Sequence, residues 1–258
     1  MSFVGCCLLL SLFFYFNPFL SFERILAQPL YFFNSIFKKS SDLPTQVKPA
    51  QSYTIALIGD SMTQFLGDGT DLKKDLKKLY PGKDFSILNF AAGSTSILTV
   101  PERLNKDILN TKPEIIILES FGNNPLSDLP LDQGLKKQQQ ALDQIIQIIK
   151  EKNPQTVLIF MATVSPSRER YGEGVVNLTT EKRRAWADER IAYIKNHIKY
   201  AKDHEIPLIN IYEKTKGNGD GNIDYINSVD FIHPSPTGIL LISSEIADYL
   251  YKNRVIPL

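Results

Sequence analysis

The chain has 258 residues, of which 43% are hydrophobic and 22% are charged, a composition typical of a globular protein with a sizeable core. The net charge is +1 and the basic residues are scattered, so the sequence indicates no binding surface for nucleic acid. The two cysteines, Cys6 and Cys7, lie near the N-terminus, which excludes a disulfide, a thiol nucleophile and a thiolate metal site from the rest of the chain.

The first segment, residues 3–22, is almost uninterruptedly apolar and carries no charge. It is long enough to span a bilayer, and it equally fits the apolar region of a cleaved signal peptide. Arg24, Lys38 and Lys39 follow it, and after an uncleaved anchor these charges would place the domain in the cytoplasm. We favour export: residues 1–27 are predicted to be a signal peptide or an N-terminal membrane anchor, and the protein to be extracytoplasmic, secreted or membrane-anchored.

Residues 28–52 are predicted to form a linker, because prolines and polar residues gather toward its end. From Tyr53 onward, short apolar runs alternate with amphipathic patterns. The apolar runs predict strands at residues 53–58, 85–90, 114–118, 156–161 and 206–212. The amphipathic patterns predict helices around residues 72–79, 101–109, 132–152, 180–203 and 236–251.

Five apolar strands separated by helices indicate an α/β protein with three layers, α/β/α, around a central five-stranded parallel sheet. Right-handed crossovers then restrict the strand order to a flavodoxin-like one or a near relative. Residues 53–258 are predicted to be one domain without internal repeats.

Candidate catalytic residues lie in four loops that follow predicted strands, and the loops after the carboxyl ends of the strands share one edge of such a sheet. These residues are Ser61, Gly93, Asn124, Asp230 and His233. Each has an ordinary interpretation as a turn or surface residue. Their common edge favours a functional interpretation, because open α/β sheets bind ligands outside the carboxyl ends of their strands.

The chemistry assigns a role to each residue. The Ser61 hydroxyl needs a neighbouring base to act as a nucleophile, and the imidazole of His233 is suited to that task. Asp230, three residues earlier on the same turn, is within reach to orient the imidazole. The N–H groups of Ser61 and Gly93 and the side-chain amide of Asn124 are the expected donors to a tetrahedral oxyanion.

These residues resemble the conserved blocks of the SGNH (GDSL-type) hydrolases. The first block is Gly59-Asp60-Ser61-Met62, the second contains Gly93, the third is Gly122-Asn123-Asn124, and the last is Asp230-Phe231-Ile232-His233-Pro234. The resemblance covers the chain from about Tyr53 to the C-terminus. It implies the flavodoxin-like SGNH-hydrolase fold, a catalytic triad of Ser61, His233 and Asp230, and an oxyanion hole of Ser61, Gly93 and Asn124.

Two positions depart from the family pattern. Met62 stands where the first block usually has Leu, a mild apolar exchange beside the nucleophile. Pro125 stands where the third block usually has Asp, so that Asn124, and not Asn123, is aligned as the oxyanion donor.

The resemblance implies a serine esterase that hydrolyses acyl esters, including O-acetyl esters, through an acyl-enzyme, with no metal or organic cofactor. With an export signal, the expected substrate is a small-molecule, glycan or lipid ester of the cell envelope or the extracellular space, and the N-terminal segment is a means of membrane attachment. Two alternatives stay open: an O-acyltransferase with the same triad, and a catalytically silent envelope-anchored binding domain.

Other features carry less weight. The Gly217–Asp224 segment resembles part of a calcium loop, but Lys216 and Asn227 occupy the positions of its two strong ligands. No spacing supports a metal site at His197 or His204. The long loop 165–179 follows a strand at the candidate edge, and the sequence leaves open whether it shapes the substrate pocket or is merely solvated.

Overall fold

Strand β1 (Ser52–Ile58) lies at the inside of a parallel sheet whose strand order is β2-β1-β3-β4-β5. The other strands are β2 (Asp84–Asn89), β3 (Ile115–Glu119), β4 (Val157–Ala162) and β5 (Leu208–Asn210). This computed structural model describes residues 43–258, so the predicted apolar segment and most of the predicted linker lie outside the described residues. Over those residues the sheet has five strands, and the predicted flavodoxin-like order is confirmed.

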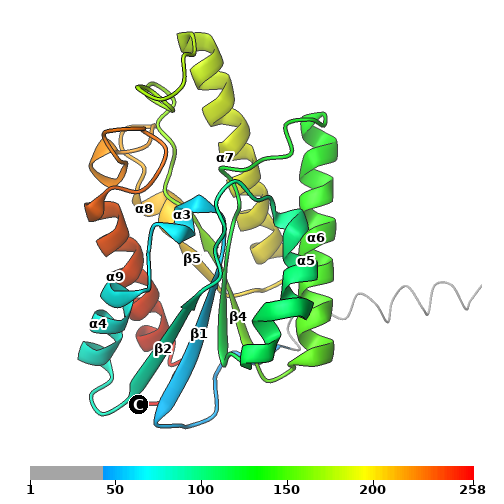
Figure 1. Ribbon diagram of the computed structural model, residues 1–258, viewed down its shortest axis with the longest axis vertical. Helices are drawn as coiled ribbons and strands as arrows, with labels where there is room; N and C mark the ends of the chain where they lie inside the picture. Colours follow the sequence, from blue (N-terminus) through cyan, green and yellow to red (C-terminus); the bar gives the residue numbers. More distant parts are fainter. Residues whose placement is uncertain (1–42) are drawn as a thin grey trace, which may run out of the picture. The chain divides into compact units, whose positions relative to one another are not determined.

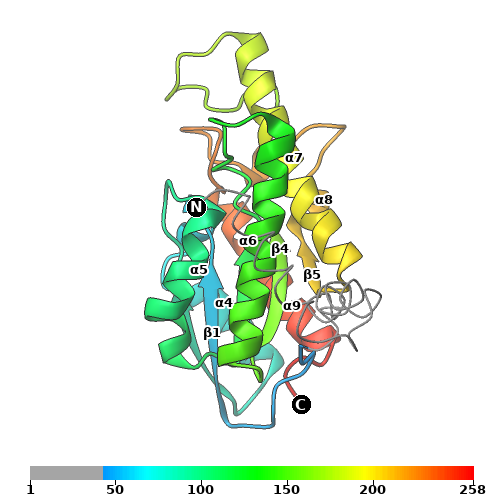
Figure 2. The same ribbon diagram turned by 90° about the vertical axis from the view of Figure 1, so that its right-hand side faces the viewer.

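Helices cover both faces of the sheet (Figure 1). α4 (Thr70–Leu79) and α9 (Pro236–Lys252) pack on one face, and α5 (Val100–Arg103), α6 (Leu131–Lys152) and α7 (Thr180–Asp203) on the other. α6 and α7 run side by side in the view turned by 90° (Figure 2). Shorter helical segments complete the chain: α3 (Ser61–Gln64), η2 (Ile97–Thr99), η3 (Leu104–Ile108), η4 (Leu109–Thr111), α8 (Ile211–Lys214) and η5 (Ile223–Tyr225).

The two faces explain why the central strands are apolar without interruption. Alternate residues of β3 enter opposite cores: Ile115 and Ile117 pack toward α4 and α9, while Ile116 and Leu118 pack toward α6. A strand that is covered on both faces has no solvated side, so its sequence shows no polar alternation.

The last strand differs from its prediction. The apolar run 206–212 predicts one strand, but β5 ends at Asn210 and the chain turns directly into α8. The Asn210 side chain accepts a hydrogen bond from the N–H of Glu213, so it caps a helix at the point where the strand would otherwise continue.

The described residues Leu43–Leu258 form one compact unit. Val47 is buried in the core beside α9, and its N–H donates to the carbonyl of Val255 at 2.9 Å. The part of the predicted linker around Val47 therefore packs on the domain, and Ser52 begins β1. Among the described residues, no helix has the length and apolar character that crossing a membrane requires.

Candidate active site

The nucleophile turn joins β1 to α3 at the upper end of the sheet in Figure 1. Asp60 caps α3, because its Oδ1 accepts the N–H of Met62 at 2.8 Å. A Cβ at position 59 would lie 2.3 Å from Thr63 Oγ1 and 2.9 Å from Glu119 Cβ, so only glycine allows this close packing. The turn therefore holds the Ser61 hydroxyl at the first residue of a helix.

A line of hydrogen bonds joins Ser61, His233 and Asp230. His233 Nε2 lies 2.9 Å from Ser61 Oγ, and His233 Nδ1 lies 2.8 Å from Asp230 Oδ2. Ser61 and His233 are 172 residues apart in the chain, and the sheet edge brings them together. This is the geometry that a serine nucleophile, a general base and an orienting carboxylate require.

The Asp230 turn keeps its carboxyl group ionised. Partial burial opposes ionisation, but hydrogen bonds from the His233 ring and from the backbone N–H groups of Ile232 and His233 outweigh it, so the pKa of Asp230 lies below its usual value. Phe231 between them adopts a left-handed backbone with φ of 51°. A left-handed backbone is strained for a residue other than glycine, and such strained residues are frequent in the turns of functional sites.

Phe65 lies beside the candidate site, and its role there was not predicted from the sequence. Its ring stacks on the His233 imidazole with centroids 4.3 Å apart and planes at 7°. Phe65 follows α3 and lies one helical turn after Ser61, which is the sequence signal that could have indicated it. Because its side chain is partly exposed, an incoming acyl or alcohol group meets an aromatic surface beside the base.

The expected oxyanion donors are close to Ser61, but one of them is engaged. A Cβ at Gly93 would lie 3.6 Å from Ser61 Cβ, yet the Gly93 N–H donates to Gln64 Oε1 at 3.0 Å. A substrate oxyanion would have to displace the Gln64 side chain to use this donor. The Ser61 N–H belongs to the first turn of α3, where N–H groups have no partner within the helix.

Asn124, and not Asn123, lies beside the nucleophile turn. The Asn124 side-chain Nδ2 donates one hydrogen to Asp60 Oδ2 at 2.9 Å, and an amide nitrogen has a second hydrogen to offer. Asn123 points elsewhere: its Oδ1 accepts the Tyr171 hydroxyl at 2.9 Å, and it is buried. Asn124 is therefore the asparagine of the third block that contacts the nucleophile turn.

A second missed residue is Glu119, the last residue of β3. Its side chain is fully buried next to Asp60, and burial together with the Asp60 charge raises the pKa of Glu119 well above its usual value. The available signal was a single glutamate that ends an otherwise apolar strand at the candidate edge.

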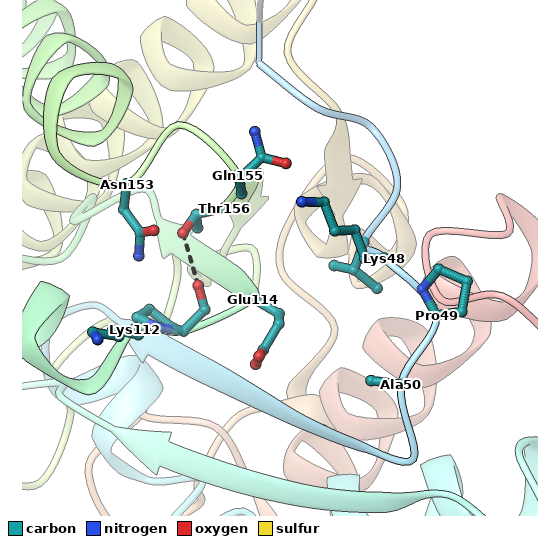
Figure 3. Close-up of a pocket in the computed structure, with 10 residues that line it drawn as sticks. Lys48, Pro49, Ala50, Lys112, Glu114, Asn153, Gln155 and Thr156 are labelled. Carbon is teal, nitrogen blue, oxygen red and sulfur yellow. Dashed lines mark hydrogen bonds between the residues drawn. The ribbon is translucent and has the colours of Figure 1, made fainter.

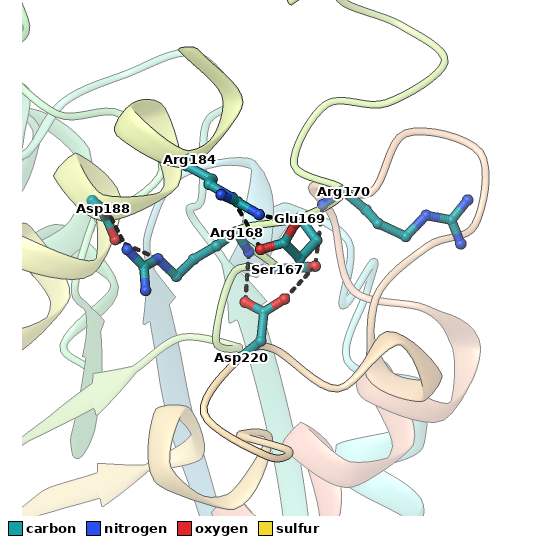
Figure 4. Close-up of polar contacts among 7 residues, drawn as sticks. All are labelled: Ser167, Arg168, Glu169, Arg170, Arg184, Asp188 and Asp220. Carbon is teal, nitrogen blue, oxygen red and sulfur yellow. Dashed lines mark hydrogen bonds and ion pairs between the residues drawn. The ribbon is translucent and has the colours of Figure 1, made fainter. Parts of the chain in front are cut away.

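Several polar contacts bind the loop 165–179 to the segments around it (Figure 4). The Asp220 carboxylate accepts the Ser167 hydroxyl and the Arg168 N–H. Ion pairs join Arg168 to Asp188 and Arg184 to Glu169, which link the loop to α7. These contacts hold the loop against α7 and against the turn that carries Asp220.

Tyr171 shows which interpretation of this loop applies. It is buried, its hydroxyl donates to Asn123, and Arg190 Nε donates to that hydroxyl at 3.1 Å. The Arg170 guanidinium also stacks over the Phe231 ring, 3.7 Å from its centroid. The loop therefore forms part of the wall around the third and last blocks and is not merely solvated.

The segment that resembles a calcium loop is a turn. Lys216 and Gly221 pair across it as an antiparallel bridge, and the Asp220 carboxylate is used by the neighbouring loop. Within residues 43–258, no three or more His, Cys, Asp or Glu side chains gather in a group that could hold a metal ion.

The comparison with family models matches residues 57–239 to the GDSL-like Lipase/Acylhydrolase family. This range includes the four turns described above. The comparison with curated proteins found no match.

Solved structures with the same fold include GDSL enzymes. A lipase/acylhydrolase from Enterococcus faecalis has 18% identity and a TM-score of 0.60, over 80% of this chain and 98% of its own. A GDSL-like lipase from Bacteroides thetaiotaomicron has 16% identity and a TM-score of 0.57, over 83% of this chain and 94% of its own. An acetyl xylan esterase has 16% identity and a TM-score of 0.54, over 79% of this chain and 100% of its own.

Proposed function

The chain belongs to the GDSL-like lipase/acylhydrolase family, and we propose that it is a serine esterase that hydrolyses acyl esters through an acyl-enzyme on Ser61. The observation that carries this proposal is the unbroken line from Ser61 Oγ through the His233 ring to Asp230, with distances of 2.9 and 2.8 Å.

In the acylation step, His233 Nε2 takes the Ser61 proton while Oγ attacks the ester carbonyl. Negative charge then develops on the carbonyl oxygen and is stabilised by the Ser61 N–H and the free hydrogen of the Asn124 amide, with the Gly93 N–H as a third donor once Gln64 moves. Collapse of the tetrahedral intermediate breaks the ester C–O bond, and His233 gives its proton to the departing alcohol.

Deacylation repeats these steps with water as the attacking group. His233 takes a proton from water, the hydroxide adds to the acyl carbonyl, and Ser61 leaves with the proton that returns from His233. Asp230 stays ionised throughout and stabilises the imidazolium that forms twice in each cycle.

The substrate is proposed to be an O-acyl group, such as an acetyl group, on a glycan or lipid outside the cytoplasm. The support comes from the uncharged apolar segment 3–22 and from the fold shared with an acetyl xylan esterase. By the same argument the protein is secreted or attached to the membrane through residues 1–27. N-terminal sequencing of the mature protein tests this point, since cleavage would leave Gln28 as the first residue.

The decisive experiment measures hydrolysis of p-nitrophenyl acetate by the purified protein. We expect Ser61→Ala to abolish turnover, and Ser244→Ala on α9 to leave it unchanged. Turnover at the wild-type rate in Ser61→Ala would refute the assignment of Ser61 as the nucleophile. Acetyl transfer to an added sugar in preference to release of acetate would make the protein an acyltransferase with the same triad.

A further inference from the structure

Glu119 lies directly beneath the nucleophile turn, where the mechanism above assigns it no role. Its Oε1 accepts the Ser120 hydroxyl at 2.6 Å, and its Oε2 faces the N–H of Asp60 at 3.4 Å. The side chain is fully buried, in contact with the position where a Cβ of Gly59 would lie. A buried carboxyl group in such a place is costly unless it is neutral or paired.

Asp60 is the second carboxyl group of this site and is also fully buried. Its Oδ1 accepts the Met62 N–H, its Oδ2 accepts the Asn124 amide, and the Glu119 side chain forms a further hydrogen bond with it. Two buried carboxyl groups in contact cannot both be ionised, so one of them holds a proton.

The donors around the pair decide where the proton lies. Asp60 receives hydrogen bonds from a backbone N–H and a side-chain amide, which stabilise a carboxylate. Glu119 receives the Ser120 hydroxyl, a long contact from the Asp60 N–H at 3.4 Å, and a hydrogen bond from the Phe121 N–H. Burial raises the pKa of both carboxyl groups, but the bonds from the Asn124 amide and the Met62 N–H oppose the rise at Asp60, whereas the Asp60 charge adds to the rise at Glu119. Glu119 is therefore the better proton carrier and Asp60 the better anion.

We propose that Glu119 is a positioning residue that, in its neutral form, donates its carboxyl proton to Asp60, and that the Asp60 carboxylate so held orients the Asn124 amide toward the oxyanion. This inference rests on the proposed esterase function, because it assigns a reason for the geometry of one of its oxyanion donors. Asp60 thereby does more than cap α3.

The proposal has a pH signature. Once Glu119 ionises at alkaline pH, it repels the Asp60 carboxylate. Asp60 then orients the Asn124 amide less well, so kcat should fall. Burial raises the pKa of Asp60, and the nearby His233 opposes that rise. Tyr171 is the other titratable group that faces Asp60, and its own pKa is raised by burial and by the Asp60 charge. Asp230 acts on Tyr171 as well. Variants at Glu119 separate its contribution from these groups.

Two substitutions distinguish positioning from mere structure. In Glu119→Gln the amide still donates to Asp60 and still accepts from Ser120, so most of the activity should return and the alkaline fall in kcat assigned to Glu119 should vanish. In Glu119→Ala the donor is lost, and kcat should fall by about tenfold or more with KM changed less than about threefold, because an oxyanion contact is made only in the transition state.

A double variant tests the route through Asn124. If Glu119 acts through that amide, adding Glu119→Ala to Asn124→Ala should lower kcat by less than about threefold more. If the double variant loses the product of the two single-variant losses in kcat, the proposal is overturned. A wild-type kcat in Glu119→Ala would overturn it as well. Glu114→Ala, at the other end of β3, is the matched control and should leave kcat unchanged.

A spectroscopic measurement on the full chain does not depend on turnover. Carbon-13 NMR of labelled glutamate, with Glu119→Gln to identify the signal, should show a neutral Glu119 carboxyl group at neutral pH. An ionised Glu119 there would overturn the proposal even if the esterase is active. Absence of esterase activity in the wild type would overturn the proposed function, and with it the catalytic part of this inference, while the NMR signal still reports the proton.

Discussion

A glutamate lies at each end of β3, and the two side chains differ in burial and in their hydrogen-bond partners. Glu114 precedes the strand, is half-buried, and its Oε2 accepts the N–H of Thr54 at 2.7 Å. It lines a pocket at the amino edge of the sheet, formed by the segments 47–50, 112–114 and 153–156 (Figure 3). Glu119 ends the strand, is fully buried, and touches the turn that carries Ser61.

The difference follows from the direction of the strands. At the carboxyl edge every strand runs into a turn, and the turn after β1 opens directly into a helix whose first N–H groups lack partners within it. At the amino edge the chain enters β2 to β5 from the carboxyl ends of helical segments, and the backbone groups of the strands are paired. Thr156 Oγ1, for example, donates to the Pro113 carbonyl and closes that edge. The candidate chemistry therefore gathers at the carboxyl edge, while structural hydrogen bonds close the amino edge.

The strongest test of this contrast pairs a triad residue with a residue of the amino edge. His233→Ala should lower kcat for p-nitrophenyl acetate by roughly 10⁴-fold or more, since it removes the base for both half-reactions. Thr156→Ala should leave kcat unchanged and lower the free energy of unfolding by about 1 kcal/mol. Steady-state kinetics and urea unfolding measure the two effects. A large loss of kcat in Thr156→Ala would break the contrast.

Substitutions of three asparagines test the same contrast between the two edges of the sheet. Asn124→Ala should lower kcat by about 100- to 1000-fold with a small change in KM, because one oxyanion donor is lost. Asn123→Ala should have a much smaller effect, since that side chain bonds Tyr171. Asn153→Ala, in the amino-edge pocket, is the control. If Asn123→Ala proves the more damaging variant, the third block is misaligned by one residue.

A third variant concerns the middle of the sheet, where we expect effects on stability and none on activity. His197 of α7 stacks on Phe160 of β4, and burial lowers its pKa to about 3. The neutral form is favoured in the folded state, so its contribution is complete above the unfolded pKa near 6.5 and is lost as the pH falls toward 3.

At pH 5 this linkage should lower the free energy of unfolding by roughly 2 kcal/mol relative to pH 8. His197→Phe should remove that part of the pH dependence, whereas His204→Phe at the end of the helix should retain it. Urea unfolding at both pH values measures the difference. The same acid sensitivity in His197→Phe as in the wild type would show that other groups cause it.

The smallest expected effect lies in the loop 165–179. Asp220→Ala removes the acceptor for Ser167 and Arg168, so the loop should hold its place less firmly. We expect KM to rise by about threefold with kcat unchanged, as for the loss of a uniform binding contribution. Asp224→Ala, in the same turn region, serves as the control. A fall in kcat would assign the loop a part in the chemical step.

Periodicity and turn signals were enough to predict the parallel sheet, its order and most helices, because a strand covered on both faces and an amphipathic helix each have a local pattern. The strand 206–212 was too long because an apolar run does not show that Asn210 caps a helix. Which turn residues lie at the candidate site was predictable as well: Ser61, His233, Asp230 and Asn124 lie together as the motif spacing indicated.

The sequence by itself determined the layers and the edge at which these residues gather, and it restricted the strand order to a flavodoxin-like one or a near relative. These features depend on patterns within single segments and on the handedness of crossovers. Only the tertiary structure decided that Gln64 engages the Gly93 N–H, that Phe65 covers His233, and that Glu119 is buried against Asp60. These contacts depend on the distances between segments far apart in the chain and on which polar groups are buried. A local sequence pattern contains neither kind of information.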